Sequence, residues 1–487
     1  MKKNVSIIGS GFASISAACY LASSGYNVNV YEKNEQLGGR ARQFIKDGFK
    51  FDMGPTWYWM PDVFERFFAD FGKKPSDYYQ LERLGPSYRV YFGQDDFIDI
   101  SDDLDEIKEV FEKIEPNASK SLTSFLKKAE KNYEVAIKDL VYKPGLSPLE
   151  LVSKKTVLEV PQFITTIHDV AERKFKNPKL KQIIEFPVLF LGAKPSMTPA
   201  FYSFMNYADL SLGTWYPKGG MKAVVDGMIK LAEEMGVHFH TNSNVSKIST
   251  GGDKKVKSIT INETEQPAEI IVSGADYAHT ETLLDEQDRV YSEAYWKKKV
   301  MAPSSLLFYV GLDKKVEQLL HHTLFFDVPF DEHAKAIYDN PQWPEKPLFY
   351  ASFPSITDGT VAPKGKEAAI FLIPLAPDLE DTEALREQYF DIIINRLEKL
   401  TNQEIRSSIL FKESYCVKDF KDDYNSFKGN AYGMANTLMQ TAFLRPKLRS
   451  KKIKNLCFTG QLTVPGPGVP PALISGKLVS DLLTKDN

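Results

Sequence analysis

The chain has 487 residues, which is more than one hydrophobic core usually supports, so we expect two or three domains. Hydrophobic residues make up 43% and charged residues 26% of the chain, which is typical of a globular protein and excludes a disordered one. The 61 basic side chains nearly balance the 64 acidic ones, so we expect no nucleic-acid partner.

The cysteines and the apolar runs restrict the cellular setting. Cys19, Cys416 and Cys457 are scattered without metal-ligand spacing, so we expect neither a disulfide framework nor a cysteine metal site, and a reducing, cytoplasmic compartment. Two lysines near the N-terminus precede an apolar run, but the glycines at 9 and 11 interrupt it, which favours a strand over a signal peptide. No apolar run reaches the roughly 18 residues that a membrane span needs, so any membrane contact should be peripheral.

The first 21 residues predict a strand, a glycine turn and a helix. Residues 5–8 are mostly apolar, and small and apolar residues recur through 13–21. Gly9 permits a sharp turn, and Gly11 lets the backbone approach a pyrophosphate at the positive end of the helix dipole. Ser14 replaces the third glycine of this nucleotide-binding fingerprint, and its small side chain is compatible with close helix–strand packing.

Glu32 and a second glycine motif identify the nucleotide. A strand over 27–31 ends just before Glu32, which follows Gly11 by 21 residues, the spacing of an acceptor for ribose hydroxyls. A carboxylate there repels the extra phosphate of NADP and suits FAD or NAD. Gly38-Gly39-Arg40 resembles the extended fingerprint of FAD oxidases, in which backbone and arginine close over the diphosphate, so we expect FAD. The alternative is a surface turn with a solvated arginine.

The next motif carries a more specific resemblance. Asp52-Met53-Gly54-Pro55-Thr56 is similar to a turn of the bacterial carotenoid desaturases of the phytoene desaturase type, in which it passes beside the flavin ring. An ordinary β-turn would explain the Gly-Pro pair as well. The aromatic cluster at 57–59 suits either a protein core or the apolar surroundings that a flavin needs to oxidise a hydrocarbon.

Residues 96–209 are expected to form an inserted helical region. Apolar residues recur at helical spacing over 104–114, with lysines between them. Leucines and valines alternate with lysines over 140–155, a pattern that predicts either a basic amphipathic surface on a membrane or packing against the body of the protein. We expect this region to contact membrane lipid.

Residues 210–285 return to the nucleotide-binding domain. The stretch 213–221 resembles the Gly-x-x-Tyr-Pro-x-Gly-Gly-Met block of the same family, and a helix over 223–235 should follow. The resemblance implies that Val245 contacts the adenine side through its backbone and that Asp276 ends a buried strand, with Gly274 in place of the usual asparagine. Two histidines on the predicted strand 238–240 lack a third ligand, so we expect no metal site.

The C-terminal part predicts a second sheet and a further block that contacts the flavin. Strands at 305–311, 348–353 and 368–375 predict a second sheet, which the resemblance assigns to the substrate, and 383–400 predicts a long helix. The block from 455 to 477 closely resembles the signature of bacterial-type phytoene desaturases. In it, Gly460 should let flavin lie against the backbone after the buried strand 456–458, and a helix beginning at Val469 and Pro470 should point its N-terminus at the flavin.

These elements predict an α/β protein with three parts. The first is a Rossmann-type FAD-binding domain formed by 1–95, 210–285 and 425–487. The second is the helical, membrane-contacting region 96–209, and the third is a mixed-sheet substrate domain over 286–424.

From the residues alone, the function is that of an FAD oxidoreductase with a large apolar substrate. The resemblance implies dehydrogenation of a long linear carotenoid, and 52–61 favours stepwise conversion of phytoene to lycopene. The alternatives are a desaturase of a later hydroxylated carotenoid of the 1'-hydroxycarotenoid 3,4-desaturase type, a flavin-dependent carotene isomerase, an amine oxidase and a non-enzymatic prenyl-binding escort. An enzyme that selects a hydroxylated carotenoid needs a buried polar group in its substrate tunnel to hydrogen-bond that hydroxyl. The sequence identifies no catalytic base and no final electron acceptor.

Overall fold

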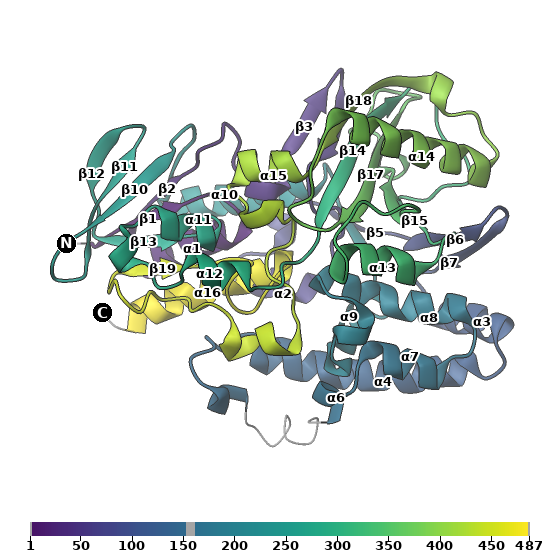
Figure 1. Ribbon diagram of the computed structural model, residues 1–487, viewed down its shortest axis with the longest axis horizontal. Helices are drawn as coiled ribbons and strands as arrows, with labels where there is room; N and C mark the ends of the chain where they lie inside the picture. Colours follow the sequence, from purple (N-terminus) through teal and green to yellow (C-terminus); the bar gives the residue numbers. More distant parts are fainter. Residues whose placement is uncertain (1, 152–160, 486–487) are drawn as a thin grey trace.

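The computed structural model describes residues 2–151 and 161–485, and its first sheet consists of five parallel strands (Figure 1). Their order across the sheet is β19 (Leu456–Phe458), β13 (Ile270–Ser273), β1 (Asn4–Ile8), β2 (Asn27–Tyr31) and β9 (His238–His240). Each neighbouring pair is parallel, so the carboxyl ends of all five strands meet at one edge. In parallel α/β sheets, ligands bind at this edge.

Different layers cover the two faces of this sheet. Ile7 belongs to a core shared with helices α1 (Phe12–Ser23), α10 (Met221–Glu234) and α16 (Val469–Lys485), and α1 packs against the other two. Ile8 points the other way, into a core shared with β10 (Val245–Thr250), the first strand of an antiparallel sheet that continues through β11 (Val256–Ile261) and β12 (Thr264–Pro267). The alternation follows from the two-residue period of a strand.

A second, mixed sheet of seven strands lies beside the first (Figure 1). Its order is β18 (Ile409–Tyr415), β14 (Ser304–Leu312), β17 (Glu367–Leu375), β16 (Phe349–Ser352), β15 (His322–Phe325), β6 (Tyr88–Gly93) and β7 (Asp96–Ile100). Helix α14 (Glu383–Thr401) packs on the face that carries Phe308, whereas Leu307 faces the opposite core. Only the β6–β15 pair is parallel among the described strands of this sheet.

The helical region lies next to the second sheet, at the lower right of Figure 1. Its helices are α3 (Leu104–Ile114), α4 (Ala118–Val135), α6 (Pro161–Ile164), α7 (Ile167–Lys174), α8 (Pro178–Glu185) and α9 (Phe204–Leu210). α4 is the central helix, because α3, α7 and α9 all contact it.

Shorter elements connect these layers. Two antiparallel pairs are the hairpin of β3 (Gln43–Lys46) with β4 (Phe49–Asp52) and the pair of β5 (Leu81–Arg83) with β8 (Trp215–Pro217), whose strands come from distant parts of the chain. The remaining α-helices are α2 (Pro61–Ala69), α11 (Tyr277–Thr282), α12 (Glu293–Lys297), α13 (Phe330–Tyr338) and α15 (Val417–Tyr424). Single helical turns are η1 (Gly39–Ala41), η2 (Pro75–Asp77), η3 (Ala136–Leu140), η4 (Pro148–Leu151), η5 (Phe186–Leu191), η6 (Pro195–Met197), η7 (Ala200–Ser203), η8 (Glu286–Asp288), η9 (Pro354–Ile356), η10 (Arg406–Ser408), η11 (Phe427–Gly429), η12 (Leu438–Gln440) and η13 (Ala442–Leu444).

The predicted α/β class is confirmed, with a parallel Rossmann-type sheet and a separate mixed sheet. Strands β6 and β7 lie on either side of the expected boundary at residue 95, and both belong to the second sheet because β6 pairs with β15. The domain limits themselves stay a prediction. Part of the expected membrane-contacting stretch, residues 152–160, lies outside the described residues.

Candidate functional site

One cavity of about 1000 Å³ begins at the carboxyl edge of the parallel sheet and continues between the second sheet and the helical region. Every residue expected to bind the cofactor lines it, with the exception of Ser14: Gly9, Gly11, Glu32, Gly38, Gly39, Arg40, Gly54, Pro55, Thr56, Val245, Asp276, Gly460, Val469 and Pro470. Residues from four widely separated parts of the chain therefore meet around one space.

The backbone at the start of α1 is shaped for close approach. Gly9 has a φ of +84°, and a Cβ there would lie 3.3 Å from the Ala275 backbone nitrogen. Gly11 caps α1 without a side-chain hydrogen bond, and no described protein atom lies within 4 Å of the position that its Cβ would take. The first N–H groups of α1 thus face the cavity, which suits a pyrophosphate.

Arg40 supplies a buried positive charge next to these N–H groups. Its Nη2 donates to Ser426 Oγ at 3.2 Å and to the Asn430 carbonyl at 3.3 Å, while its Nε has no partner among the described residues. Burial lowers the pKa of this guanidinium, because desolvation disfavours its charge. The nearby Asp276 carboxylate offsets part of that cost, and an anionic group such as a diphosphate would offset more of it.

Glu32 is held at the cavity edge by short hydrogen bonds. Its Oε2 accepts from the Ser10 backbone N–H at 3.0 Å and from Ser10 Oγ at 2.7 Å, and its Oε1 accepts from the Asn34 N–H at 3.0 Å. These bonds fix the carboxylate at the end of β2 while it still lines the cavity. Ser10 and Asn34 were not expected from the sequence, because neither belongs to the glycine fingerprint.

Ser14 does not reach the cavity, and its role is packing. It is fully buried, and a Cβ on Gly274 would lie 2.0 Å from its Oγ. The two departures from the family pattern therefore compensate each other, since the serine occupies the space that a side chain at 274 would need. Sequence motifs treat the two positions separately and could not reveal this.

The far end of the polar part of the cavity contains Val245 and Asp276. Asp276 is buried, which raises its pKa, and it accepts from the His279 N–H at 3.2 Å and the Phe427 N–H at 3.1 Å. It thereby caps α11 and holds the 427 loop near Arg40. His279 and Asn425, which hydrogen-bond each other at 3.1 Å, also line the cavity and were missed from the sequence.

Two segments continue the cavity away from the nucleotide site. The turn at Gly54 packs so tightly on the Arg40 backbone that a Cβ would lie 2.3 Å from the Arg40 carbonyl oxygen. Gly460 has a φ of +100°, and its N–H donates to Ser475 Oγ of α16 at 3.0 Å. Helix α16 starts at Val469 beside the same space, so the positive end of its dipole points at the cavity. Of its first N–H groups only that of Val469 is available to a polar edge of a ring system, because the next two residues are prolines and the Ala472 N–H donates to the Gly468 carbonyl at 3.1 Å.

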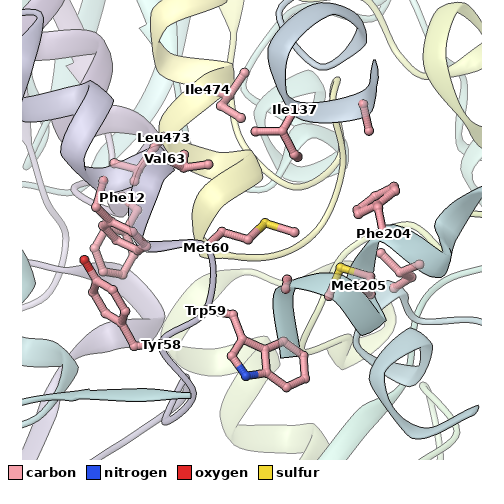
Figure 2. Packing of buried hydrophobic residues seen from close by; sticks show 14 of the residues in the cluster. Phe12, Tyr58, Trp59, Met60, Val63, Ile137, Phe204, Met205, Leu473 and Ile474 are labelled. Carbon is pink, nitrogen blue, oxygen red and sulfur yellow. The ribbon is translucent and has the colours of Figure 1, made fainter. Parts of the chain in front are cut away.

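Beyond this point the cavity widens into a chamber that consists mainly of apolar side chains. Trp57 contacts Phe186 and Phe190 with ring centroids 5.6 and 5.8 Å apart. Figure 2 shows Trp59 and Met60 on one side of this packing and Phe204 and Met205 on the other. The aromatic cluster at 57–59 is thus both core and cavity wall.

A polar strip interrupts the apolar wall on the side of the second sheet. The hydroxyl-bearing residues on it are Thr56, Ser305, Tyr338, Tyr350 and Tyr432. Burial raises the pKa of Tyr432 to about 12, so its hydroxyl stays protonated at neutral pH. Tyr338 ends α13, Tyr350 lies on β16 and Tyr432 lies in a loop, so their sequence positions gave no signal of this cluster.

Comparison with known proteins identifies the family. Residues 13–484 match the model of the flavin containing amine oxidoreductases. The chain is 43% identical to a carotenoid 3,4-desaturase of Haloarcula japonica, over 99% of this chain and 98% of that one. It is 31% identical to a 4,4'-diapophytoene desaturase (4,4'-diaponeurosporene-forming) of Staphylococcus aureus, over 99% of both chains.

Solved structures agree on the fold. A crystal structure of an oxidoreductase from Methanosarcina mazei superposes with a TM-score of 0.65 at 15% identity, covering 98% of this chain and 100% of that one. The resemblance found in the glycine motifs is thereby confirmed over nearly the whole length. The protein belongs to the flavin-containing amine oxidoreductases and, within them, to the carotenoid desaturases, which are oxidoreductases acting on CH–CH groups.

Proposed function

We propose that the protein is an FAD-dependent desaturase that converts a CH–CH single bond of a long linear carotenoid into a double bond. The observation that carries this proposal is the single cavity, which joins a nucleotide-shaped polar end to a large aromatic chamber. A bound flavin supplies a two-electron acceptor for hydride, and the protein orders a flexible hydrocarbon and excludes water from the reacting carbons.

The residues at the polar end have distinct roles in holding FAD. Gly11 and the first turn of α1 receive the diphosphate together with Arg40. The Arg40 Nε has no hydrogen-bond partner among the described residues, which costs free energy in a buried site unless a ligand accepts from it. Glu32 accepts from the ribose, and Val245 lies on the adenine side. Gly54-Pro55-Thr56 and the Gly460 turn border the ring.

The two carotenoid classes considered from the sequence can be weighed with the structure. Greater identity to a 3,4-desaturase, at 43% against 31%, favours a later carotenoid as substrate. The hydroxyls of Tyr338 and Tyr432 on the chamber wall also favour it, because a buried hydroxyl can hydrogen-bond an oxygen function of the substrate. Phytoene, converted stepwise to lycopene, is the second candidate, favoured by the stretch 52–61.

Expression in cells that accumulate phytoene, and separately in cells that accumulate lycopene or its hydroxylated derivatives, distinguishes the two. We expect a longer chromophore only with the later carotenoids, detected as a red shift of the extracted pigment. Lycopene formed from phytoene would support the second candidate. Turnover of amines without any carotenoid conversion would contradict both.

We also propose that the protein binds membranes peripherally at the mouth of the chamber. No helix among the described residues is long and apolar enough to cross a bilayer. Ile164 and Met439 both line the cavity, and their side chains are 79% and 71% exposed. Leu149 lies in the chain between the lining residues Ser147 and Glu150 and is 76% exposed. Apolar side chains around an opening would let a hydrocarbon pass from lipid to chamber without crossing water.

Liposome flotation tests this surface. The variant with Ile164→Ser and Met439→Ser should float roughly tenfold less than the wild type, since it removes buried apolar contact with lipid. The matched control, Ile45→Ser with Leu410→Ser, replaces residues that are 59% and 47% exposed on β3 and β18, far from the cavity mouth (Figure 1). Equal loss of flotation in both pairs would argue against the proposed surface.

A further inference from the structure

Three side chains form a continuous hydrogen-bonded row that leads out of the cavity. Thr56 Oγ1 lies 2.9 Å from the Tyr350 hydroxyl, and that hydroxyl lies 2.6 Å from His322 Nδ1. Thr56 and Tyr350 line the cavity, whereas His322 lies behind them and is fully buried. The row therefore runs from the cavity surface into the second sheet.

Thr56 occupies the point where the two ends of the cavity meet. Two residues before it, Gly54 rests on the Arg40 backbone at the polar end. One residue after it, Trp57 contacts Phe186 and Phe190 of the apolar chamber. Thr56 itself lines the cavity between these two segments, where a carbon from the chamber would approach the polar end.

His322 is an unusual residue for a purely structural position. Its ring stacks on Trp57 with centroids 4.0 Å apart and lies 4.5 Å from the His321 ring. Its Nε2 has no partner among the described residues, which costs free energy in a buried site. Burial, together with His321, holds the pKa of His322 well below its usual range, so its imidazole is neutral at neutral pH.

We propose, resting on the desaturase function above, that Thr56, Tyr350 and His322 form the relay that accepts the proton lost by the carotenoid. Thr56 is the catalytic residue of this relay, because it is the member that lines the cavity next to the turn at Gly54. Tyr350 and His322 are positioning residues that act through it. No catalytic base could be identified from the sequence, and this row supplies one.

The step balances as follows. A bound flavin would be the oxidant and would take one hydrogen with its electron pair from the first carbon. On the neighbouring carbon the C–H bond breaks, its electron pair becomes the new double bond, and its proton passes to Thr56 Oγ1. Thr56 gives its own proton to the Tyr350 oxygen, and Tyr350 gives its proton to His322 Nδ1. The substrate has then lost one hydride and one proton.

A weak base is sufficient for this chemistry. Loss of hydride leaves the substrate electron-poor, and a C–H bond next to such a carbon is strongly acidic. A neutral imidazole in an apolar wall also avoids placing a permanent charge beside a hydrocarbon.

The test uses purified holoprotein with carotenoid in liposomes and measures flavin reduction in a single anaerobic turnover. Tyr350→Phe keeps the ring and removes only the hydroxyl, so the rate should fall by about 100-fold, the usual contribution of general acid–base catalysis. Thr56→Val should lower the rate of flavin reduction by a similar factor, and Thr56→Ser, which keeps the hydroxyl, should react at about the wild-type rate. Flavin content and carotenoid affinity should stay within about twofold of wild type, which separates the relay from a packing effect.

The matched control is Tyr309→Phe. Tyr309 is also a buried tyrosine of the second sheet, but its hydroxyl donates to the Met53 carbonyl at 2.9 Å and lies off the cavity. Its removal should leave the single-turnover rate unchanged.

A second readout does not depend on turnover. In ¹⁵N NMR spectra of the seven histidines, Tyr350→Phe should shift the Nδ1 resonance of His322, assigned with His322→Asn, and leave the distant histidines unchanged. The relay is refuted if Tyr350→Phe and Thr56→Val both reduce flavin within about threefold of the wild-type rate, or if the His322 resonance does not respond. Conversion of carotenoid by the wild type tests the desaturase proposal separately.

Discussion

The two ends of the cavity bind by different means. The nucleotide end consists of backbone: glycines at 9 and 11, the start of α1, and one buried guanidinium, Arg40. The chamber consists of side-chain surface from many elements, with Trp57 and Phe186 in contact across it. A charged cofactor of fixed shape is recognised by fixed dipoles, whereas a flexible hydrocarbon is recognised by volume.

This difference implies that substitutions at one end of the cavity should not impair binding at the other end. Damage to the backbone end should remove flavin from a protein that remains folded. Damage to the chamber should cost stability and carotenoid binding while flavin stays bound. The following predictions test that separation, beginning with the largest effect.

Gly11→Val should abolish flavin binding, with at least a roughly tenfold loss of bound flavin, because the side chain would enter the space of the pyrophosphate. The substitution should not unfold the protein, since φ at Gly11 is −71° and no described atom lies within 4 Å of its Cβ position. Flavin absorbance and the thermal midpoint measure the two effects. Gly252→Val, at a glycine with equal free space outside the cavity, is the control. Full flavin content in Gly11→Val would overturn the assignment.

Phe186→Ala should lower the free energy of unfolding by about 3–5 kcal/mol, the usual cost of a large cavity in a core. Phe186 is 5% exposed and contacts several rings of the chamber. Phe186→Leu, which keeps more of the side-chain volume, should lower the free energy of unfolding by a smaller amount. Denaturant unfolding measures both, and the flavin content should not change in either variant. A loss of flavin would show that the two ends are coupled.

Gly274→Ala should destabilise the nucleotide end through a single contact, the 2.0 Å approach to Ser14 Oγ. Ser14→Ala in the same chain should recover most of the loss, because it removes that oxygen. A double-mutant cycle should give a coupling energy of about 1–3 kcal/mol. If the two changes in the free energy of unfolding are additive, the backbone must move to relieve the contact between residue 274 and Ser14.

Asp209 makes the chamber end sensitive to pH. It lies on α9 with its pKa raised to about 8 by burial, and it accepts from the Tyr88 hydroxyl at 2.8 Å. Because the unfolded carboxyl titrates near pH 4, the folded state holds an extra proton between about pH 4 and 8, and the free energy of unfolding should fall as pH rises, by up to about 1.4 kcal/mol per pH unit. Asp209→Asn should flatten this slope in denaturant titrations between pH 5 and 8. An unchanged slope would assign the dependence to other groups.

Local patterns predicted much of the fold. The strands at 27–31 and 456–458 match β2 and β19 residue for residue. The first alternates polar and apolar residues and the second is a short apolar run, and both patterns are typical of strands. The pairing of β6 with β15 could not be foreseen, because its partners are more than 200 residues apart and either strand alone is compatible with either sheet.

The same contrast applies to the site. The sequence alone predicted the residues of the polar end, which line one cavity in the structure, because positive-φ turns and helix N-termini require glycine at particular spacings, and those spacings are local. Only the tertiary structure decided the rest: the compensation between Ser14 and Gly274, the chamber, and the contact of Thr56 with Tyr350 across 294 positions of sequence. Such contacts depend on the shape and direction of side chains from distant segments, and no short pattern of residue types specifies them.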